Sequence, residues 1–554
     1  MINSWETVVP FFKNLKERKI ESLEDLEKWL LEWSELEAVF SEHAGWKYIQ
    51  MSCHTLNKEF TEAYQFYIST IEPQSAPFIN EFNKKLIHSP FVKFLNKEGY
   101  AIFLRAVRQQ VELFREENIP LFTEIETRSQ TYGLIASEMM VLVDGKEITM
   151  QNAATLLKDP TRKKREEVYL KIHNRRLQDK DKLNTLFTEL VQLRDQVARN
   201  AGFKNFRDYM FAALGRFDYQ VEDCYRFHES IKKEILPIVE SIDLHRQEAL
   251  KVKKLKPWDT EVDISAKPAL KPFNSTEELI DKTIKCFYRI RPFYGERLEI
   301  MKKMGHLDLE SRKGKAPGGY NYPLHEIGVP FIFMNSVGSL RDLITIVHEG
   351  GHALHSFLTR DLEITEFKST PSEVAELASM SMELISMEFW DEFFEQKEEL
   401  KRAKKEQLEK VLHMFPWIAS VDKFQHWIYE HPLHTKEERQ QQWEKISIEF
   451  GSKLIDWLGH ENIRGNAWQN QLHIYEVPFY FIEYAIAQLG AIAIWRNYKK
   501  NPKKALDQYE NALKLGYTKS IPEIYQTAGI SFDFSADYVR ELAEFVKKEL
   551  EELA

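Results

Sequence analysis

The sequence predicts a mainly α-helical fold with a small β-sheet, and two observations lead to that prediction. Glycine (21 residues) and proline (20 residues) are scarce in a chain of 554 residues, which favours long helices over tight turns. Apolar residues from Leu26 to Phe40 also recur at three- and four-residue spacing, after Ser22, which can cap a helix N-terminus. Packing against a core explains this stripe, so residues 1–130 are expected to form an N-terminal helical region without catalytic groups.

Two segments depart from the helical pattern and are predicted to be β-strands. Met139 to Met150 reads MMVLVDGKEITM, where two β-prone runs flank Asp144-Gly145, a strong signal for a hairpin. Val329 to Met334 (VPFIFM) is predicted to be one buried or edge strand. Leu255 to Phe273, rich in proline and lysine, is predicted to be a surface loop. Helical patterns otherwise prevail, and residues 131–554 are expected to form a second helical region.

Charge and cysteine content exclude several classes of protein. The net charge is −10, with 76 basic and 86 acidic residues, so the chain lacks the basic surface of a nucleic-acid-binding protein. Cys53, Cys224 and Cys286 are far apart and form no CxxC pair. A disulfide framework is therefore not expected, the cysteines are interpreted as inert thiols, and a reducing cytoplasm is the expected location.

A membrane partner is not expected either. The N-terminus does not have the basic and apolar regions of a signal peptide. The most membrane-like stretch, Phe479 to Trp495, is interrupted by Glu483 and Gly490 and is short for a bilayer span. We therefore predict a buried helix there.

The segment Ile344 to Leu354, ITIVHEGGHAL, carries the strongest functional signal. On a helix, His348 and His352 lie one turn apart on one face, so both imidazoles can reach one zinc ion. Glu349 lies about 100° around the helix, on the side where water would bind, and can act as general base. The run is otherwise apolar, which places the histidines near a core.

Two adjacent glycines in the same helix predict a close contact. Gly350 and Gly351 together reduce helix propensity by about 1–2 kcal/mol. A helix that keeps both is expected to need close backbone approach at that point.

A third ligand is needed, because catalytic zinc usually has three protein ligands and one open position. The metzincin pattern requires glycine at position 355 and histidine at position 358, whereas this chain has His355 and Leu358. A carboxylate from a later helix is therefore expected. The segment STPSEVAELASMSME, in which Pro371 and Ser372 suit a helix start, presents three glutamates on one helical face, and physical reasoning alone does not choose among them. They are Glu373, Glu376 and Glu383.

The motif HEGGHALH, followed by AELAS, resembles the thimet oligopeptidase and oligoendopeptidase F family of zinc metallopeptidases. The resemblance implies that Glu376, 24 residues after His352, is the third zinc ligand. It also implies that Glu373 is a neighbour supporting the ligands, and that His355 is a supporting partner rather than a ligand.

Further segments extend the resemblance over about residues 140–545, with a better fit to the smaller bacterial members. These segments are Arg199–Met210, GKAPGGYNYP, VPFIFMNSVGS, His473–Gln488 and Ile521–Phe534. The resemblance implies an elongated zincin-type helical body, divided by a deep substrate channel with zinc at its floor. Such a channel would admit short peptides and exclude folded proteins.

The segment HIYEVPFYFIEYAIAQ offers donors for the oxyanion that peptide hydrolysis produces. Tyr480 and Tyr484 are four residues apart and can share a helical face, and His473 lies just before that helix. The three are predicted as a group, without a choice of which one stabilises the oxyanion. Tyrosines packed in a core with satisfied hydroxyls are the alternative.

The expected function is a zinc-dependent oligopeptidase with one Zn²⁺, in which Glu349 activates zinc-bound water to hydrolyse internal bonds of short peptides. The strand at 329–334 is expected to pair with the peptide backbone, giving length preference with little side-chain selectivity. A metal-dependent exopeptidase is one alternative, and a non-catalytic helical scaffold that binds no stoichiometric zinc is the other. Side-chain preference, physiological substrate and oligomeric state do not follow from the sequence.

Overall fold

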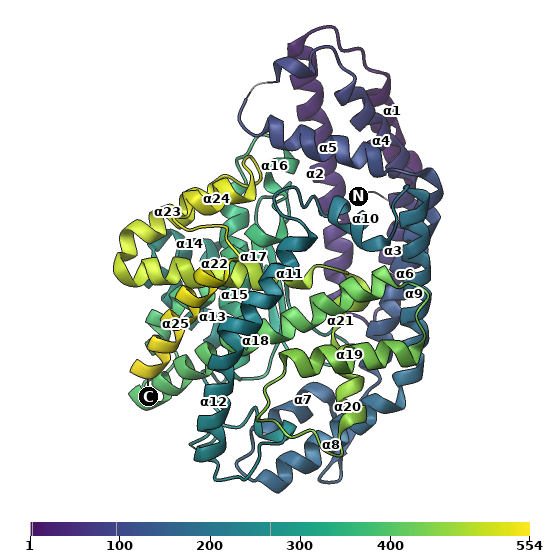
Figure 1. Ribbon diagram of the computed structural model, residues 1–554. Coiled ribbons are helices and arrows are strands. Elements are labelled where there is room, and N and C mark those ends of the chain that lie inside the picture. Colours follow the sequence, from purple (N-terminus) through teal and green to yellow (C-terminus); the bar gives the residue numbers. More distant parts are fainter. Residues whose placement is uncertain (1, 3, 96, 266, 554) are drawn as a thin grey trace.

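The computed structural model describes the chain except residues 1, 3, 96, 266 and 554, and its architecture is mainly helical, as predicted (Figure 1). The N-terminal helices are α1 (Trp5–Glu17), α2 (Leu23–Cys53), α3 (Lys58–Phe66), α4 (Glu72–Ile87) and α5 (Tyr100–Leu113). Ser22 caps α2 as expected, because its hydroxyl accepts a hydrogen bond from the Asp25 N–H. These helices share a hydrophobic core of their own, which Ile364 and Phe367 from the body complete.

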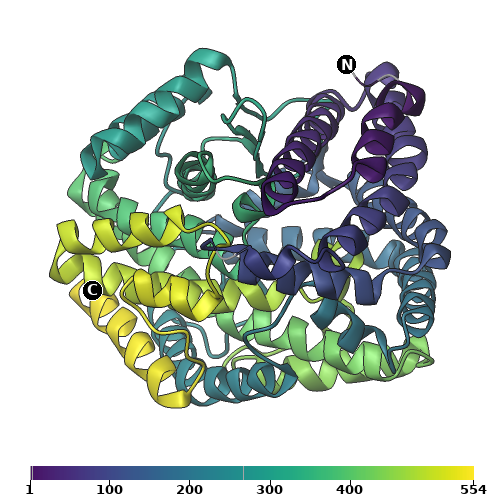
Figure 2. The same ribbon diagram turned by 90° about the horizontal axis from the view of Figure 1, so that it is seen from above.

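The body follows in sequence order. Its first helices are α6 (Ile119–Ser137), α7 (Met150–Thr155), α8 (Arg162–Gln178), α9 (Lys180–Asn200), α10 (Phe206–Ala213), α11 (Val221–Ser230), α12 (Leu236–Ala249), α13 (Thr276–Ile290) and α14 (Pro292–Met304). The later helices are α15 (Leu340–Thr359), α16 (Thr365–Lys368), α17 (Ser372–Ser386), α18 (Lys397–Glu430), α19 (Lys436–Phe450), α20 (Glu461–Gly465), α21 (Leu472–Glu476), α22 (Phe481–Lys500), α23 (Pro502–Lys514), α24 (Ile521–Thr527) and α25 (Ala536–Glu552). Figure 2 shows the N-terminal helices (purple) and the C-terminal helices (yellow) on opposite sides of the molecule.

The predicted hairpin is confirmed. Strands β1 (Met140–Val143) and β2 (Lys146–Thr149) pair antiparallel around a two-residue turn. Asp144 and Gly145 both adopt positive φ, at 51° and 75°, as the tight hairpin turn requires.

The second sheet corrects one expectation about substrate binding. Its strand order is β3 (Leu307–Glu310), β5 (Phe331–Ser336), β4 (Tyr320–Tyr322), so the predicted strand lies in the centre and is buried. Strand β5 pairs with β3 on one side and β4 on the other, so it cannot pair with a peptide as expected. The strand was predicted to be buried or at an edge, and the buried alternative is confirmed; β3 and β4 are the two edge strands of this sheet.

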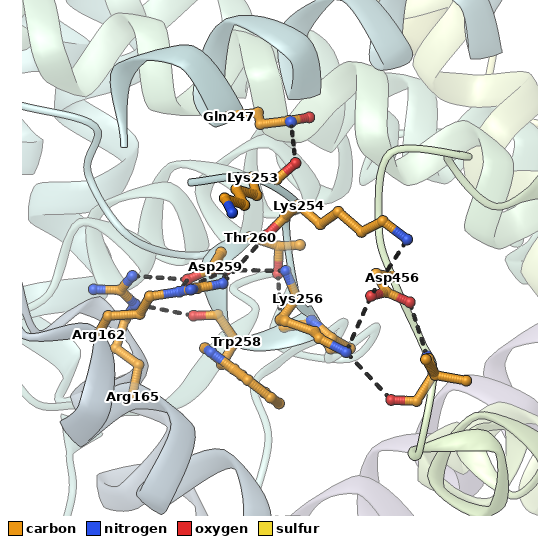
Figure 3. Close-up of polar contacts among 12 residues, drawn as sticks. Arg162, Arg165, Gln247, Lys253, Lys254, Lys256, Trp258, Asp259, Thr260 and Asp456 are labelled. Carbon is orange, nitrogen blue, oxygen red and sulfur yellow. Dashed lines mark hydrogen bonds and ion pairs between the residues drawn. The ribbon is translucent and has the colours of Figure 1, made fainter. Parts of the chain in front are cut away.

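The predicted surface loop at Leu255–Phe273 is wrong in its first part. Pro257–Asp259 form a short 3₁₀ helix that is buried against α8. The Asp259 carboxylate is fully buried and accepts hydrogen bonds from both Arg162 and Arg165 of that helix (Figure 3). A buried ion pair with two guanidinium partners fixes this segment, which composition alone could not indicate.

The centre of the body is a close packing of α15, α17, α22 and α13. A Cβ added to Gly351 would lie 2.6 Å from the Ser379 Cα atom of α17, and one added to Gly350 would lie 2.7 Å from the Phe287 ring of α13. The predicted close backbone approach is confirmed at Gly351, where it sets the position of α15 against α17, whereas the close neighbour of Gly350 is the side-chain ring of Phe287.

Helix α22 is the buried helix predicted for the membrane-like stretch. Among the residues that the structure describes, none of the helices combines the length and apolarity that crossing a bilayer requires.

Candidate metal centre

Three donor side chains from α15 and α17 converge at one point. The Glu376 Oε2 atom lies 3.4 Å from His348 Nε2 and 3.7 Å from His352 Nε2. Donor atoms around a tetrahedral zinc ion lie about 3.3–3.6 Å apart, since the metal–ligand distances are about 2.0–2.2 Å. Two imidazoles and a carboxylate at this spacing fit such an ion, and they leave one coordination position for water or substrate.

The sequence places these donors through ordinary helix geometry. Ser339 caps α15 and Asp342 completes a capping box, so the helix is already regular where the two histidines occur one turn apart. Helix α17 begins at Ser372, after Pro371, as predicted. Gly351 lets the backbones of α15 and α17 approach each other closely. The Glu376 carboxylate of α17 can therefore reach both histidines.

Glu376 is held in place by two hydroxyl groups. Ser379 donates to its Oε2 at 3.1 Å, and Tyr480 donates to its Oε1 at 2.7 Å. The carboxylate is buried, and the two bonds restrict its rotation.

His348 is supported from behind by a carboxylate and an amide. Its Nδ1 lies 2.7 Å from Glu383 Oε1, and Gln407 donates to Glu383 Oε2 at 2.8 Å. This contact directs the His348 Nδ1–H toward Glu383 and leaves Nε2 as the free donor for a metal. Burial alone would lower the pKa of His348, but Glu383 and Glu376 raise it to about 9. These carboxylates favour positive charge at the ring, which a bound metal ion would supply in place of the Nε2 proton.

Glu349 lies beside the three donors and is buried in the same cavity. Burial, together with Glu376 and Glu383, raises its pKa to about 7, while the neighbouring His348 acts in the opposite direction. A carboxylate with a pKa near neutrality is suited to accept and return a proton.

The two tyrosines and His473 lie together, as predicted from the sequence. Tyr480 and Tyr484 both line the cavity, with ring centroids 5.2 Å apart. His473 contacts them from behind, with its Nε2 3.3 Å from the Tyr484 hydroxyl. Tyr480 immediately precedes α22, and Tyr484 lies in its first turn.

The hydrogen bonds behind His473 determine which way its protons point. The Trp417 indole N–H donates to Gln471 Oε1 at 3.0 Å, which fixes the orientation of that amide. The Gln471 Nε2 group then donates to His473 Nδ1 at 2.7 Å. His473 therefore carries its proton on Nε2 and donates it to Tyr484, whose own hydroxyl proton is left for another acceptor.

The sequence also predicted Glu373 and His355 as supporting partners of the ligands. Glu373 accepts a hydrogen bond from Tyr219 at 2.6 Å and lies outside the donor group. His355 lines the cavity, but its Nε2 has no hydrogen-bond partner among the described residues. Burial and His352 lower its pKa to about 3, which keeps the ring neutral.

One buried ion pair near the site was not predicted. Arg216 donates to Glu483 at 2.9 Å and to the Phe479 carbonyl at 2.5 Å. Phe479 adopts a positive φ of 68°, which is strained for a residue with a side chain, and its N–H donates to Gln425. These contacts fix the chain where it enters α22. Glu483 in an apolar run indicates a buried partner, but nothing in the sequence identifies Arg216.

Comparison with known proteins gives concordant matches. Residues 155–544 match the model of peptidase family M3, and residues 2–114 match that of the peptidase M3 N-terminal domain. Oligopeptidase PepF of Bacillus subtilis is 24% identical over 74% of this chain and 60% of its own length. An oligoendopeptidase F homolog of Borreliella burgdorferi is 24% identical over 67% of this chain and 62% of its own. The chain thus spans about 60% of the length of these curated relatives.

Solved structures match over nearly the whole chain. A structure of PZ peptidase A with an inhibitor has a TM-score of 0.93 at 27% identity, covering 99% of this chain and 97% of the other. A putative oligoendopeptidase F from Bacillus anthracis has a TM-score of 0.89 at 24% identity, covering 99% and 96%, and supports the fold alone.

Proposed function

The chain belongs to peptidase family M3, and we propose that it is a zinc-dependent oligopeptidase that hydrolyses internal bonds of short peptides. The observation that carries the proposal is the convergence of His348, His352 and Glu376 beside a buried Glu349 in one cavity. A zinc ion held by the three donors would polarise the scissile carbonyl and lower the pKa of a water molecule.

Glu349 acts as the general base and then as the general acid. It accepts a proton from the attacking water, and it delivers that proton to the leaving nitrogen when the C–N bond breaks. With a pKa of about 7, the carboxylate can both accept a proton and return it near neutral pH.

Tyr484 is the residue we assign to the developing oxyanion. Tyr480 already donates its proton to Glu376, whereas the Tyr484 hydroxyl accepts from His473 and keeps its proton available. A hydroxyl held in this way can donate to the carbonyl oxygen as it gains negative charge. Tyr480 instead keeps Glu376 oriented.

The cavity supports a peptide substrate in extended form. Its volume is about 430 Å³, and it is lined by β4 residues as well as by the α15 donors. Because β4 has one unpaired edge in its sheet, a peptide can add there as a further strand, in place of the β5 pairing expected from the sequence. Backbone pairing of this kind favours short, extended chains over folded proteins.

A metal-dependent exopeptidase is the second candidate, because two basic side chains line the cavity. Arg360 and Lys368 line the same cavity as the donors, and either could bind a terminal carboxylate. Peptides with acetylated N-termini and amidated C-termini distinguish the candidates, because only an endopeptidase cleaves them. We expect internal cleavage of the doubly blocked peptides, and we expect a chelator to abolish it. Removal of residues only from unblocked ends would instead favour the exopeptidase.

A further inference from the structure

A second group of metal-ligating side chains lies between α11 and α18, apart from the candidate metal centre. We call it the α11–α18 cluster; its members are Cys224 and His228 from α11 and Asp422 and His426 from α18. Each helix contributes a pair at i and i+4, one turn apart on the same face. We infer that the α11–α18 cluster binds a structural zinc-class ion.

The donor atoms are close enough to share one ion. One donor atom from each of Cys224, Asp422 and His426 lies within 4.8 Å of the others. The Asp422 Oδ2 atom lies 2.8 Å from His228 Nε2 and 3.1 Å from His426 Nε2. Donors in a tetrahedral zinc site are about 3.3–3.8 Å apart. Cys224, Asp422 and His426 supply the three donors that lie close together, and His228 joins the group through its contact with Asp422.

Burial leaves several polar atoms of the group without partners, although Asp422 Oδ2 bonds both imidazoles. All four side chains are at most 2% exposed. His228 Nδ1, His426 Nδ1 and Asp422 Oδ1 have no hydrogen-bond partner in the described part of the chain. Buried polar atoms without partners are unfavourable, and they are uncommon in well-packed helical cores.

The donor types select the class of metal. Burial raises the pKa of the Cys224 thiol, so the thiolate forms only when a metal binds. That thiolate, the Asp422 carboxylate and two neutral imidazoles would then carry a total charge of −2, which a divalent ion cancels inside the core. Thiolate and imidazole favour zinc over magnesium or calcium, which prefer oxygen ligands. The sequence-based interpretation of Cys224 as an inert thiol would then be incomplete.

The position of the α11–α18 cluster also suggests what the ion stabilises. Gln425, which lies between the two α18 ligands, accepts the hydrogen bond from the strained Phe479 backbone. The His426 ring packs against the Phe479 ring, with centroids 5.3 Å apart. An ion that fixes α18 to α11 would therefore hold the chain that enters α22 just before Tyr480.

Cobalt substitution distinguishes the two sites, because only the α11–α18 cluster contains sulfur. We expect elemental analysis of the purified full-length protein to give two zinc ions per chain. After exchange with Co²⁺ alone, we expect a near-ultraviolet thiolate-to-cobalt charge-transfer band. Cys224→Ser should remove that band and one metal ion, whereas His348→Ala should remove one ion and keep the band.

Two further variants keep the test decisive. Cys286→Ser is the matched control, since Cys286 is equally buried but belongs to neither donor group among the described residues. Asp422→Asn, which preserves side-chain shape, replaces Cys224→Ser if that variant does not fold. One metal ion per folded wild-type chain, with no thiolate band, would overturn the inference, as would a band that persists in Cys224→Ser. Either result is independent of the active-site proposal.

Discussion

The hydroxyl of Tyr480 donates a 2.7 Å hydrogen bond to Oε1 of Glu376, the carboxylate whose other oxygen faces both histidines. Tyr484, one helical turn later, makes no such bond and is oriented by His473. The two tyrosines therefore have different roles: Tyr480 supports a metal ligand, and Tyr484 offers its proton to the substrate.

This difference predicts distinct effects of the two conservative substitutions. Tyr484→Phe should reduce kcat by about 10²–10³-fold with unchanged metal affinity, as loss of one oxyanion donor does. Tyr480→Phe should weaken metal binding by about tenfold, because a ligand loses its support. Steady-state kinetics at saturating metal and competitive zinc titrations separate the two effects. Equal metal affinities in both variants would contradict the proposed role of Tyr480.

The contact behind His348 predicts a further change in metal affinity. Glu383→Gln should weaken zinc binding by about 10–100-fold, since His348 loses a carboxylate partner at 2.7 Å. Glu373→Gln is the matched control on the same helix, because Glu373 bonds Tyr219 rather than a metal donor. Equilibrium zinc titration of both variants checks this, and the reverse order of affinities would show that Glu373 is the supporting group.

The close contact at Gly351 predicts that a larger residue there destabilises the protein, and Gly133, a glycine in another helix, provides the control. Gly351→Ala should destabilise the protein by about 1–3 kcal/mol, because the new Cβ would lie 2.6 Å from the Ser379 Cα. Gly133→Ala in α6 should stabilise slightly, by about 0.5–1 kcal/mol, since no described atom lies within 4 Å of its added Cβ. Calorimetric Tm values of the two variants test the contrast, and equal Tm values would argue against tight α15–α17 packing.

The buried Arg216–Glu483 pair predicts that the losses of stability caused by substituting each residue are not additive. Arg216→Met should be strongly destabilising, by about 3–5 kcal/mol, because it leaves the Glu483 carboxylate buried without a cation. Adding Glu483→Gln should recover part of that loss, since the unpaired charge is removed. Thermal unfolding of both single variants and the double variant measures the coupling. Additive losses would mean that the two side chains do not depend on each other.

Local patterns in the sequence predicted the parts of the protein that depend on local geometry. The i, i+4 spacing of His348 and His352 and the hairpin at Asp144-Gly145 are set within a few residues, so period and turn chemistry suffice. Partners distant in sequence were not predictable in this way. Glu383 was considered only as a possible ligand, and Gln407 behind it carries no motif.

The peptide pairing that was wrongly expected of the strand at 329–334 has a similar cause. The apolar run VPFIFM indicates burial, but strand order depends on which segments pair with it, and β3 and β4 are only four and three residues long. The supporting role predicted for His355 came from the family resemblance. In the structure His355 lines the same cavity as the donors, and its supporting role stays a prediction.

The central claim is that Glu349 transfers the proton while His348, His352 and Glu376 hold the metal. Glu349→Gln tests it most directly, with metal content and cleavage of a doubly blocked peptide measured on the same preparation. We predict that the variant binds as much zinc as the wild type and that kcat/KM falls by at least about 10³-fold, consistent with loss of a general base. Wild-type cleavage rates at wild-type zinc content would contradict the claim.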